Sequence, residues 1–262
     1  MDKALEYRFL HDLVAAPTLA ELEPCMIDYL CGTFNAQTLT LMEYRANAQP
    51  DLLTTHIPNT ALHQFFQRHY AQIGYMLDPF YIASQSGPPM MLHTLRQIAP
   101  DRFETSEYYA RYYSATGLID ELGATLRIGP GRALHLSLGR DRALGRYRAQ
   151  DARHFHLLAP VVMARLRTLV QSAPQMPKMS SAPDLIQRYR ALPGCSGARA
   201  LTQREAQIAA LIVQGHSSRA AGLRLGISDQ TIKVHRRNIY KKLHVSSQNE
   251  LFSLLVRGLV EA

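Results

Sequence analysis

The stretch SDQTIKVHRRNIYKKL, residues 228–243, carries the sharpest pattern in the chain. Ile232, Ile239 and Leu243 recur at helical spacing, which predicts a helix with one buried face. A second face carries an amide, two cations and a small apolar group, the side-chain types that read base edges and thymine methyl groups in the major groove. This second face consists of Gln230, Lys233, Val234 and Arg237.

The residues beside this face predict further contacts with DNA. Thr231 lies next to Gln230 at the start of the helix. Cations and imidazoles at the margins of a reading helix are suited to phosphate contacts, which position the helix on the duplex. The flanking residues of this kind are His235, Arg236, Lys241 and Lys242. We therefore predict that double-stranded DNA is a partner of this segment.

Three more short helices are predicted around residues 228–243. Thr202 and Glu205 have the spacing of a capping box, and Gly215 ends the helix that they open. A second helix is predicted over residues 217–225, and a fourth begins after Ser247 with another capping box. A helix, a tight turn and a second helix with a polar, basic N-terminal half form the docking arrangement of a helix-turn-helix.

Residues 201–262 resemble the LuxR-type helix-turn-helix of bacterial transcription regulators. The matching residues are Leu201-Thr202-Gln203-Arg204-Glu205, Gly215, Leu225-Gly226-Ile227-Ser228, Thr231-Ile232-Lys233-Val234-His235, Asn238-Ile239, Lys242-Leu243-His244-Val245 and Glu250-Leu251. Two positions depart from the pattern. Gly222 lies inside the second helix, where glycine costs about 1 kcal/mol relative to alanine. Gln248 stands where arginine is common.

The resemblance also implies partners for the chain. It implies that the fourth helix contributes to a homodimer interface on DNA, although packing on the third helix explains its apolar residues equally well. It further implies RNA polymerase as a partner. For a two-fold dimer, we expect an operator with two half-sites about one helical turn apart.

The basic character of the chain is concentrated in its last quarter. Residues 198–262 hold ten Lys or Arg and four Asp or Glu, whereas residues 1–197 hold nineteen and seventeen. A small basic module attached to a near-neutral one suggests polyanion binding with a different role upstream. The three cysteines fit no zinc or redox spacing, and no apolar run reaches about 18 residues. We therefore expect a cytoplasmic protein without metal, cofactor or membrane span.

Composition also predicts how the chain divides. Residues 173–198 are rich in proline and glycine and are predicted to form a linker, with one short helix inside it. The linker would join a ligand-sensing or dimerisation domain, residues 1–172, to a DNA-binding domain, residues 199–262. The second of these is expected to be an all-α, four-helix domain.

The N-terminal residues mix helical and strand periods. Helical spacing from Leu5 to Leu30 precedes a β-prone segment at residues 37–45. Residues 121–140 give the clearest hairpin, because apolar residues alternate on both sides of a Gly-Pro-Gly turn. An amphipathic helix follows from Phe155 to Leu169. This order predicts an α+β domain, an antiparallel sheet flanked by helices in an α-β-α sandwich.

The N-terminal domain also resembles the ligand-binding domain of LuxR-type quorum-sensing receptors. Acyl-homoserine lactone receptors place Trp, Tyr, Asp and Trp along a stretch that here holds Phe65 or Phe66, His69 or Tyr70, Asp78 and His93. The chain has no tryptophan, so an indole donor for a lactone carbonyl is absent. LuxR-type solo regulators with a GAF-like sensor are a closer likeness. Their motifs match Asp78-Pro79-Phe80-Tyr81, Ser106-Glu107-Tyr108-Tyr109 and Gly117-Leu118-Ile119-Asp120-Glu121-Leu122-Gly123.

Tyrosine clustering independently suggests a pocket. Seven of the thirteen tyrosines lie between residues 70 and 113. Tyrosine offers an apolar ring and one hydroxyl, which suits a mostly apolar site with a few polar anchors. Packing of a helix on the sheet, or a dimer face, would explain the cluster equally well. Asp-Pro also starts ordinary turns. The candidate ligand-binding residues are Phe65, Phe66, His69, Tyr70, Tyr75, Asp78, Phe80, Tyr81, His93 and Tyr109.

These patterns favour a transcription regulator whose N-terminal domain senses a small, largely apolar or aromatic ligand. A ligand would act by binding one arrangement of the dimer better than another. The alternative is a regulator without a ligand, whose N-terminal domain mediates dimerisation or protein interaction. An enzyme is not expected, since the chain contains no nucleophile elbow, P-loop or paired metal ligands. His69, His93 and His135 lack such paired spacing.

Overall fold

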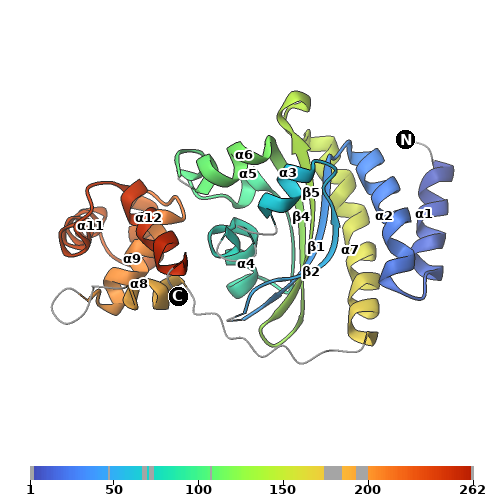
Figure 1. Cartoon of the computed structure of the whole chain (residues 1–262). Coiled ribbons are helices and arrows are strands. Elements are labelled where there is room, and N and C mark those ends of the chain that lie inside the picture. The colour runs from blue at the N-terminus through green and yellow to red at the C-terminus, as the bar shows by residue number, and fades with distance from the viewer. Residues whose placement is uncertain are drawn as a thin grey trace.

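A five-stranded antiparallel sheet organises the N-terminal part of the chain (Figure 1). Its strands are β1 (Thr38–Arg45), β2 (Asp51–His56), β3 (Met90–Thr94), β4 (Leu118–Gly129) and β5 (Arg132–Asp141). They lie in the order β2-β1-β5-β4-β3. The computed structural model describes residues 3–46, 48–66, 70, 74–106, 108–173, 185–192 and 200–260.

The predicted hairpin is confirmed as the pair β4 and β5, which is central in the sheet. Leu126 lies opposite Leu134, and Gly131 adopts φ 62° in the turn, a conformation that favours glycine. Successive side chains of a strand point to opposite faces. Leu122 and Ala124 of β4 therefore share one face, while Glu121 and Thr125 lie on the other. The strands β2 and β3, at the two edges, were not predicted from the sequence.

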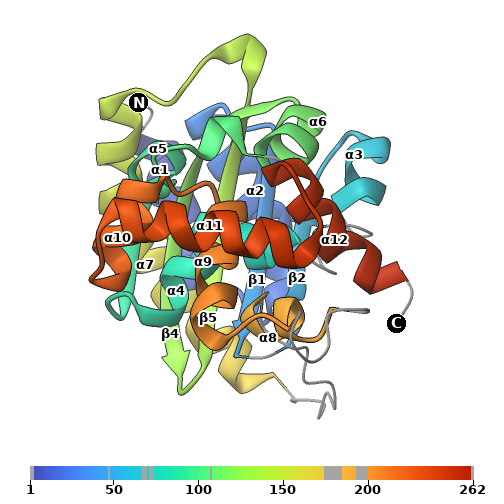
Figure 2. The same cartoon turned by 90° about the vertical axis from the view of Figure 1, so that its left-hand side faces the viewer.

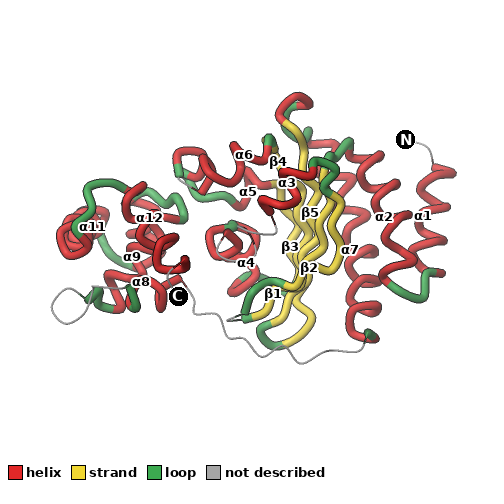
Figure 3. Tube along the Cα trace, in the orientation of Figure 1, coloured by secondary structure: helices red, strands yellow, loops and turns green. Residues whose placement is uncertain are grey.

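Three helices cover the face that carries Leu122 and Ala124 (Figure 3). They are α1 (Lys3–Ala15), α2 (Leu19–Phe34) and α7 (Ala149–Ser172). The amphipathic pattern predicted for the last helix is confirmed, because its apolar stripe is buried against the sheet. The stripe consists of Phe155, Leu158, Val162, Leu166 and Leu169. This layer is an ordinary apolar core.

Short helical segments cover the opposite face of the sheet. They are α3 (Thr60–Phe65), η2 (Gly74–Leu77), α4 (Pro79–Ser86), α5 (Leu95–Ile98), η3 (Phe103–Thr105), the π-helical turn η4 (Tyr109–Tyr113) and α6 (Ser114–Thr116). A further turn, η5 (Arg142–Leu144), follows β5. Isolated π-helical turns occur frequently at functional sites. This irregular layer surrounds the cavity described below.

The C-terminal region is helical, as predicted. It contains α8 (Leu185–Arg190), α9 (Gln203–Val213), α10 (Ser218–Leu225), α11 (Asp229–Leu243) and α12 (Gln248–Val260). The predicted caps Thr202 and Ser228 are confirmed, because their hydroxyls accept backbone N–H donors at 3.2 and 3.0 Å. Ser217 caps α10 in the same way, at 3.1 Å. The cap of α12 differs in part. Glu250 accepts the backbone amide of Ser246, one residue before the predicted partner.

The presence of a glycine at position 222, inside α10, has a structural reason that the sequence did not reveal. A Cβ atom at this position would lie 2.6 Å from the carbonyl oxygen of Ile227 and 3.3 Å from the amide of Asp229. The close approach lets α10 pack against the turn that leads into α11. The expected loss of local stability therefore needs correction, because glycine here permits the helix-turn-helix angle.

The C-terminal helices pack on the irregular layer of the N-terminal region (Figure 1). One continuous apolar cluster contains Tyr75, Met76 and Phe103 together with residues of α8, α9 and α12. The amide of Arg102 donates to the carbonyl of Gly215 at 3.0 Å, and the Asp101 carboxylate accepts the amide of Ser217 at 3.0 Å. Most of the predicted linker lies outside the described residues, but its short helix is present as α8.

Candidate ligand pocket and candidate nucleic-acid interface

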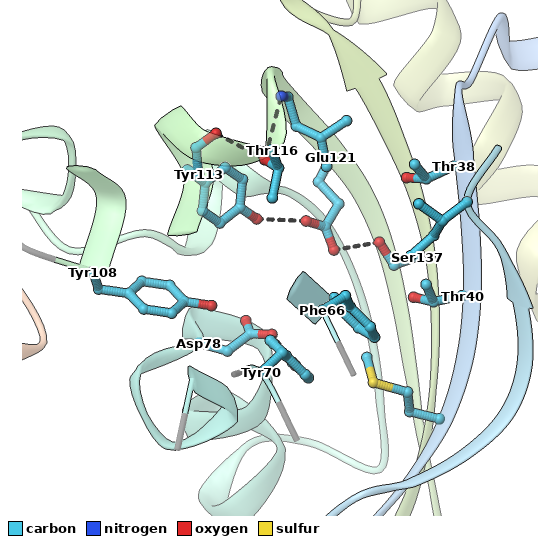
Figure 4. Close-up of a pocket in the computed structure, with 13 residues that line it drawn as sticks. Thr38, Thr40, Phe66, Tyr70, Asp78, Tyr108, Tyr113, Thr116, Glu121 and Ser137 are labelled. Atoms are coloured by element: carbon cyan, nitrogen blue, oxygen red, sulfur yellow. Dashed lines mark hydrogen bonds between the residues drawn. The ribbon is translucent and has the colours of Figure 1, made fainter. Parts of the chain in front are cut away.

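A cavity of about 70 Å³ lies between the sheet and the irregular layer (Figure 4). It combines an apolar part with carboxyl, phenol and hydroxyl groups. Its lining residues are Thr38, Thr40, Met42, Ile57, Phe66, Tyr70, Asp78, Tyr108, Tyr113, Thr116, Leu118, Glu121 and Ser137. The cavity is therefore built from strands β1, β4 and β5 and from the segments around α4 and η4.

Asp78 is placed in this cavity by the start of α4. One of its carboxyl oxygens accepts the Phe80 amide at 2.8 Å and caps the helix, and Pro79 occupies the first helical position. The other oxygen accepts the Tyr70 hydroxyl, and the Tyr44 hydroxyl lies 3.5 Å away. The Asp-Pro pair thus starts a helix and also presents a buried carboxyl to the cavity.

The electrostatic environment of Asp78 is unfavourable for its charge. Burial and the negative charge of Glu121 raise the pKa of the Asp78 carboxyl to about 6. His135, the Tyr70 hydroxyl and the Phe80 amide act in the opposite direction. Burial, followed by the charge of Asp78, also raises the pKa of Tyr44 and Tyr70 well above the usual range, so both phenols remain neutral hydrogen-bond donors.

Glu121 is the second buried carboxyl of the cavity. It accepts the Tyr113 hydroxyl at 2.5 Å and also the Ser137 hydroxyl. Nε2 of His135 lies 3.7 Å from the same carboxyl, and the imidazole Nδ1 is 3.0 Å from the Thr125 hydroxyl. Burial raises the pKa of Glu121, but the nearby His135 imidazole and the hydrogen bonds from Ser137 and Tyr113 outweigh burial and leave the pKa below its usual range.

Two further hydroxyl groups face the cavity without partners. Thr38 is 7% exposed and Thr40 is 6% exposed, and both line the cavity from β1. Figure 4 shows their hydroxyls directed toward the carboxyl groups. No hydrogen bond joins either hydroxyl to another of the described residues. Both hydroxyls are therefore available to a bound molecule.

Three of the ten predicted ligand residues line this cavity, namely Phe66, Tyr70 and Asp78. His69 and the side chain of Phe65 lie outside the described residues. The structure places the other five elsewhere. His93 needs correction first, because it is half-buried on edge strand β3, where it pairs with Gly123, and it does not line the cavity.

The other four residues are aromatic and belong to packing layers. Phe80 is buried against Gly123 and the His135 ring, with 4.9 Å between the ring centroids. Tyr109 stacks on Tyr113, outside the cavity lining. Tyr75 and Tyr81 line a separate open groove of about 630 Å³ between α4 and helices α8–α10. The tyrosine cluster of the sequence therefore contains residues with three different positions: in the cavity, in packing layers and in the groove between the two regions.

Glu121 was the most important residue missed. The motif that contains it was noted from the sequence, but its side chain was not assigned to the pocket. A usable signal was present, because Glu121, Thr125, His135 and Ser137 alternate with the leucines of the hairpin. Polar residues at every second position of a buried strand place a polar layer on one face of the sheet.

The predicted reading face of α11 is exposed. Ile232 and Ile239 are fully buried and Leu243 is 6% exposed, as predicted. Gln230, Thr231, Lys233, Val234, Arg237 and Lys241 are exposed, and His235, Arg236 and Lys242 are half-buried. Figure 2 shows α11 across the front of the molecule, on the side away from the sheet. The packing of the two regions therefore leaves this face open to a duplex.

Three of the predicted DNA contacts already have partners within the helix or the domain. Lys233 forms an exposed ion pair with Asp229 at 3.0 Å, and the Arg236 guanidinium donates to the Tyr240 hydroxyl at 3.1 Å. Lys242 is different in kind, because its ammonium lies 2.7 Å from the Glu205 carboxyl and 3.4 Å from the carbonyl of Ala200. The structure thus places the charge of Lys242 inside the domain.

Comparison with known proteins identifies the family. Residues 199–255 match the GerE model, described as bacterial regulatory proteins of the luxR family. An Aeromonas salmonicida protein from the exeN 3′ region, described as an HTH-type transcriptional regulator, is 33% identical over 189 residues. That alignment covers 71% of this chain and 96% of the relative. The chain belongs to the LuxR family of bacterial regulators. It is a DNA-binding transcription regulator and not an enzyme.

Two further similarities cover parts of this LuxR-family regulator. UhpA of Escherichia coli K12, a transcriptional regulatory protein, is 43% identical over 58 residues, which are 22% of this chain and 30% of UhpA. The VqsR LBD domain of Pseudomonas aeruginosa aligns with a TM-score of 0.55 and 24% identity, covering 64% of this chain and 98% of that domain. The second similarity shows that the N-terminal fold is shared.

The described part of the chain contains neither a membrane-spanning helix nor a group of side chains arranged for a metal ion. None of the helices there is long and apolar enough to cross a membrane. No group of three or more His, Cys, Asp or Glu side chains in the described part of the chain is arranged to hold a metal ion.

Proposed function

We propose that this LuxR-family regulator changes its DNA binding when a small molecule occupies the cavity beside Asp78 and Glu121. The observation that carries the proposal is a cavity that combines two buried carboxyls with two hydroxyls lacking partners among the described residues, located in the layer that contacts the helix-turn-helix. The proposed ligand contacts are Phe66, Tyr70 and Asp78, with Glu121 added from the structure.

A continuous set of contacts supports coupling between the cavity and the DNA-binding region. Tyr113, which donates to Glu121, has its ring 5.4 Å from the ring of Phe103. The residue before Phe103 is Arg102, whose amide donates to Gly215. Asp101 accepts the amide of Ser217, the N-cap of α10. A ligand that moves Tyr113 would therefore bias the position of α10, provided that it binds one arrangement better than the other.

The DNA contacts are proposed for the exposed part of α11. Gln230, Val234 and Arg237 would read base edges in the major groove. Lys233 and Lys241 would contact base edges or phosphate groups. Thr231, His235 and Arg236 would support the same surface. We further propose a homodimer that binds two half-sites about one helical turn apart, engages RNA polymerase and works in the cytoplasm, where the DNA is. The domains would be residues 1–172 and 199–262, joined by residues 173–198.

The DNA part of the proposal is tested by selecting bound sequences from a random duplex library with the full chain. An enriched, two-fold related motif with half-sites about 10 base pairs apart is expected. The double variant Lys233→Ala/Arg237→Ala should lose that enrichment while keeping its thermal unfolding curve. If it selects the same motif as strongly as the parent chain, α11 does not read the bases.

The size of the cavity favours one competing function. Its volume of about 70 Å³ is far below the roughly 300–1,000 Å³ of drug-sized ligand sites. This favours a regulator without a ligand, in which the N-terminal domain provides only dimerisation or protein contacts. Native mass spectrometry of the protein purified from bacterial cells separates the two. A retained mass that is lost on denaturation supports the sensor, and a bare dimer whose DNA binding no small molecule alters supports the alternative.

A further inference from the structure

The ionisable groups around the cavity can carry more negative than positive charge. Asp78 and Glu121 both contribute buried carboxyls, and the thirteen lining residues include no Lys or Arg. His135, which is fully buried behind Glu121, is the one imidazole that the structure brings near them among the described residues. With both carboxyls ionised, even a charged imidazole leaves a net negative charge. A buried charge without an opposite charge is costly.

The hydrogen bonds to the two carboxyls do not supply the missing positive charge. The donors are the neutral phenols of Tyr70 and Tyr113, the Ser137 hydroxyl and the Phe80 backbone amide. A carboxylate offers about four acceptor positions, so both groups retain capacity for a further donor. An ammonium group carries three donors and no acceptor, and it matches two carboxylates better than any neutral polar group.

On these grounds we infer that the ligand of the cavity is a small primary or secondary amine, bound as its ammonium ion beside Asp78 and Glu121. The inference rests on the proposed sensor function and names the chemical class of its ligand. The Thr38 and Thr40 hydroxyls lack partners among the described residues. They donate hydrogen bonds to the remaining polar groups of the ligand or accept hydrogen bonds from them. Met42, Ile57 and Phe66 enclose a short apolar body.

The cavity disfavours a neutral lactone for the same reasons. Lactone and amide carbonyls are acceptors, so they find no partner in the two carboxylates and depend on neutral hydroxyl donors such as Thr38 and Thr40. The chain has no tryptophan to donate an indole N–H. At roughly 10–15 Å³ for each water molecule, the volume of about 70 Å³ corresponds to a body of only a few heavy atoms. A short alkylamine fits this space, whereas a long acyl chain does not.

The test compares probes that differ mainly in charge, using the full chain and isothermal titration calorimetry. The probes are n-butylammonium, 1-butanol, butyrate and hexanoyl-homoserine lactone. We expect n-butylammonium to bind at least about tenfold more tightly than 1-butanol, because charge-assisted hydrogen bonds are about twice as strong as neutral ones. Equal binding of the amine and the alcohol overturns the inference. Tighter binding of the lactone, or binding of none of the four probes, overturns it as well.

Two variants locate the effect within the cavity. Glu121→Gln keeps the shape of the side chain and an acceptor for Tyr113, so the preference for the amine over the alcohol should fall about tenfold. Asp120→Asn is the matched control, because Asp120 is also a buried carboxyl but accepts the Tyr147 amide at 3.0 Å outside the cavity. An unchanged preference in Glu121→Gln, or an equal loss in the control, contradicts the inference.

A second readout uses only the parent chain, so it does not depend on whether a variant folds. The raised pKa of the Asp78 carboxyl leaves it partly protonated near pH 6, and an ammonium ion beside it would lower that pKa. The titratable groups that interact with Asp78 are Glu121, His135, Tyr44, Tyr70 and Tyr113. Amine binding at pH 6 should therefore release protons, seen as a binding enthalpy that depends on the ionisation enthalpy of the buffer. Binding without proton release contradicts the inference.

DNA binding distinguishes failure of this inference from failure of the proposed function. Fluorescence anisotropy with the selected duplex is measured in the same samples, with and without each probe. If a lactone or another neutral molecule alters DNA affinity while the amine does not bind, the sensor proposal stands and the amine is wrong. If DNA affinity responds to no small molecule, and the purified protein retains none, both fail.

Discussion

Lys241 and Lys242 are neighbours on α11, and the sequence predicts that both contact DNA. The structure gives the two side chains different surroundings. Lys241 is exposed, whereas the Lys242 ammonium is 2.7 Å from the Glu205 carboxyl, whose side chain is 7% exposed. Substituting each by glutamine removes one positive charge from one of two adjacent positions of α11. The pair is therefore a matched test of which lysine contacts phosphate.

The two substitutions should differ in the salt dependence of DNA binding. Each phosphate contact contributes about 0.9 to the slope of log affinity against log salt concentration. Lys241→Gln should reduce the slope by about 0.9 for each recognition helix, which is roughly a 3.5-fold smaller loss of affinity between 50 and 200 mM salt. Lys242→Gln should leave the slope unchanged. Anisotropy titrations at four salt concentrations measure both.

The free energy of unfolding should change in the reverse order, with a larger decrease for Lys242→Gln than for Lys241→Gln. Removing Lys242 leaves Glu205 without its cation while Glu205 still accepts the Thr202 amide at 2.9 Å. The side chain of Lys242 is 29% exposed, so the cost is smaller than for a fully buried pair, at about 1–2 kcal/mol. Urea unfolding followed by circular dichroism measures it. The reasoning is refuted if Lys242→Gln lowers the salt slope as much as Lys241→Gln and leaves the unfolding free energy unchanged.

Three other substitutions test separate parts of the structure. The pKa of Glu205 is lowered despite burial, so its stabilising contribution is present above about pH 4.5 and is lost as the pH falls through the lowered pKa. Thermal unfolding of Glu205→Gln should therefore depend less on pH between 3 and 5. Gly222→Ala should destabilise by about 1 kcal/mol in urea unfolding, because the close contact with Ile227 outweighs the helix-propensity gain. Asp101→Ala should speed hydrogen exchange at the Ser217 amide, and an unchanged rate would argue against the interdomain contact.

The helix-turn-helix could be predicted from the sequence because its determinants are local. Thr202, Ser217 and Ser228 each cap a helix within three residues, and the apolar spacing of α11 selects its buried face. What the sequence could not show was the partner of Lys242, because Glu205 is 37 residues away. Charge alone does not distinguish a phosphate contact from an internal ion pair.

The sensor fold was predicted in outline because its long hairpin and its amphipathic helix have strong periods. The edge strands β2 and β3 are short, with five or six residues each, and carry little alternation of their own. Their pairing is set by the neighbouring strands rather than by local propensity. The order of the strands also follows from non-local pairing, since β1 lies beside β5 rather than β4.

The cavity shows why its ligand class needed the structure. Asp78 comes from a helix cap, and Glu121 comes from a strand 43 residues later, so neither spacing nor composition predicts that they share a space. The resemblance to lactone receptors directed attention to Asp78 and to aromatic positions. The alternation of the hairpin placed Glu121 on the same buried face as Ser137 and His135. A second carboxyl changes the chemistry of the site, because a pocket with one acid suits a neutral amide donor and a pocket with two favours a cation.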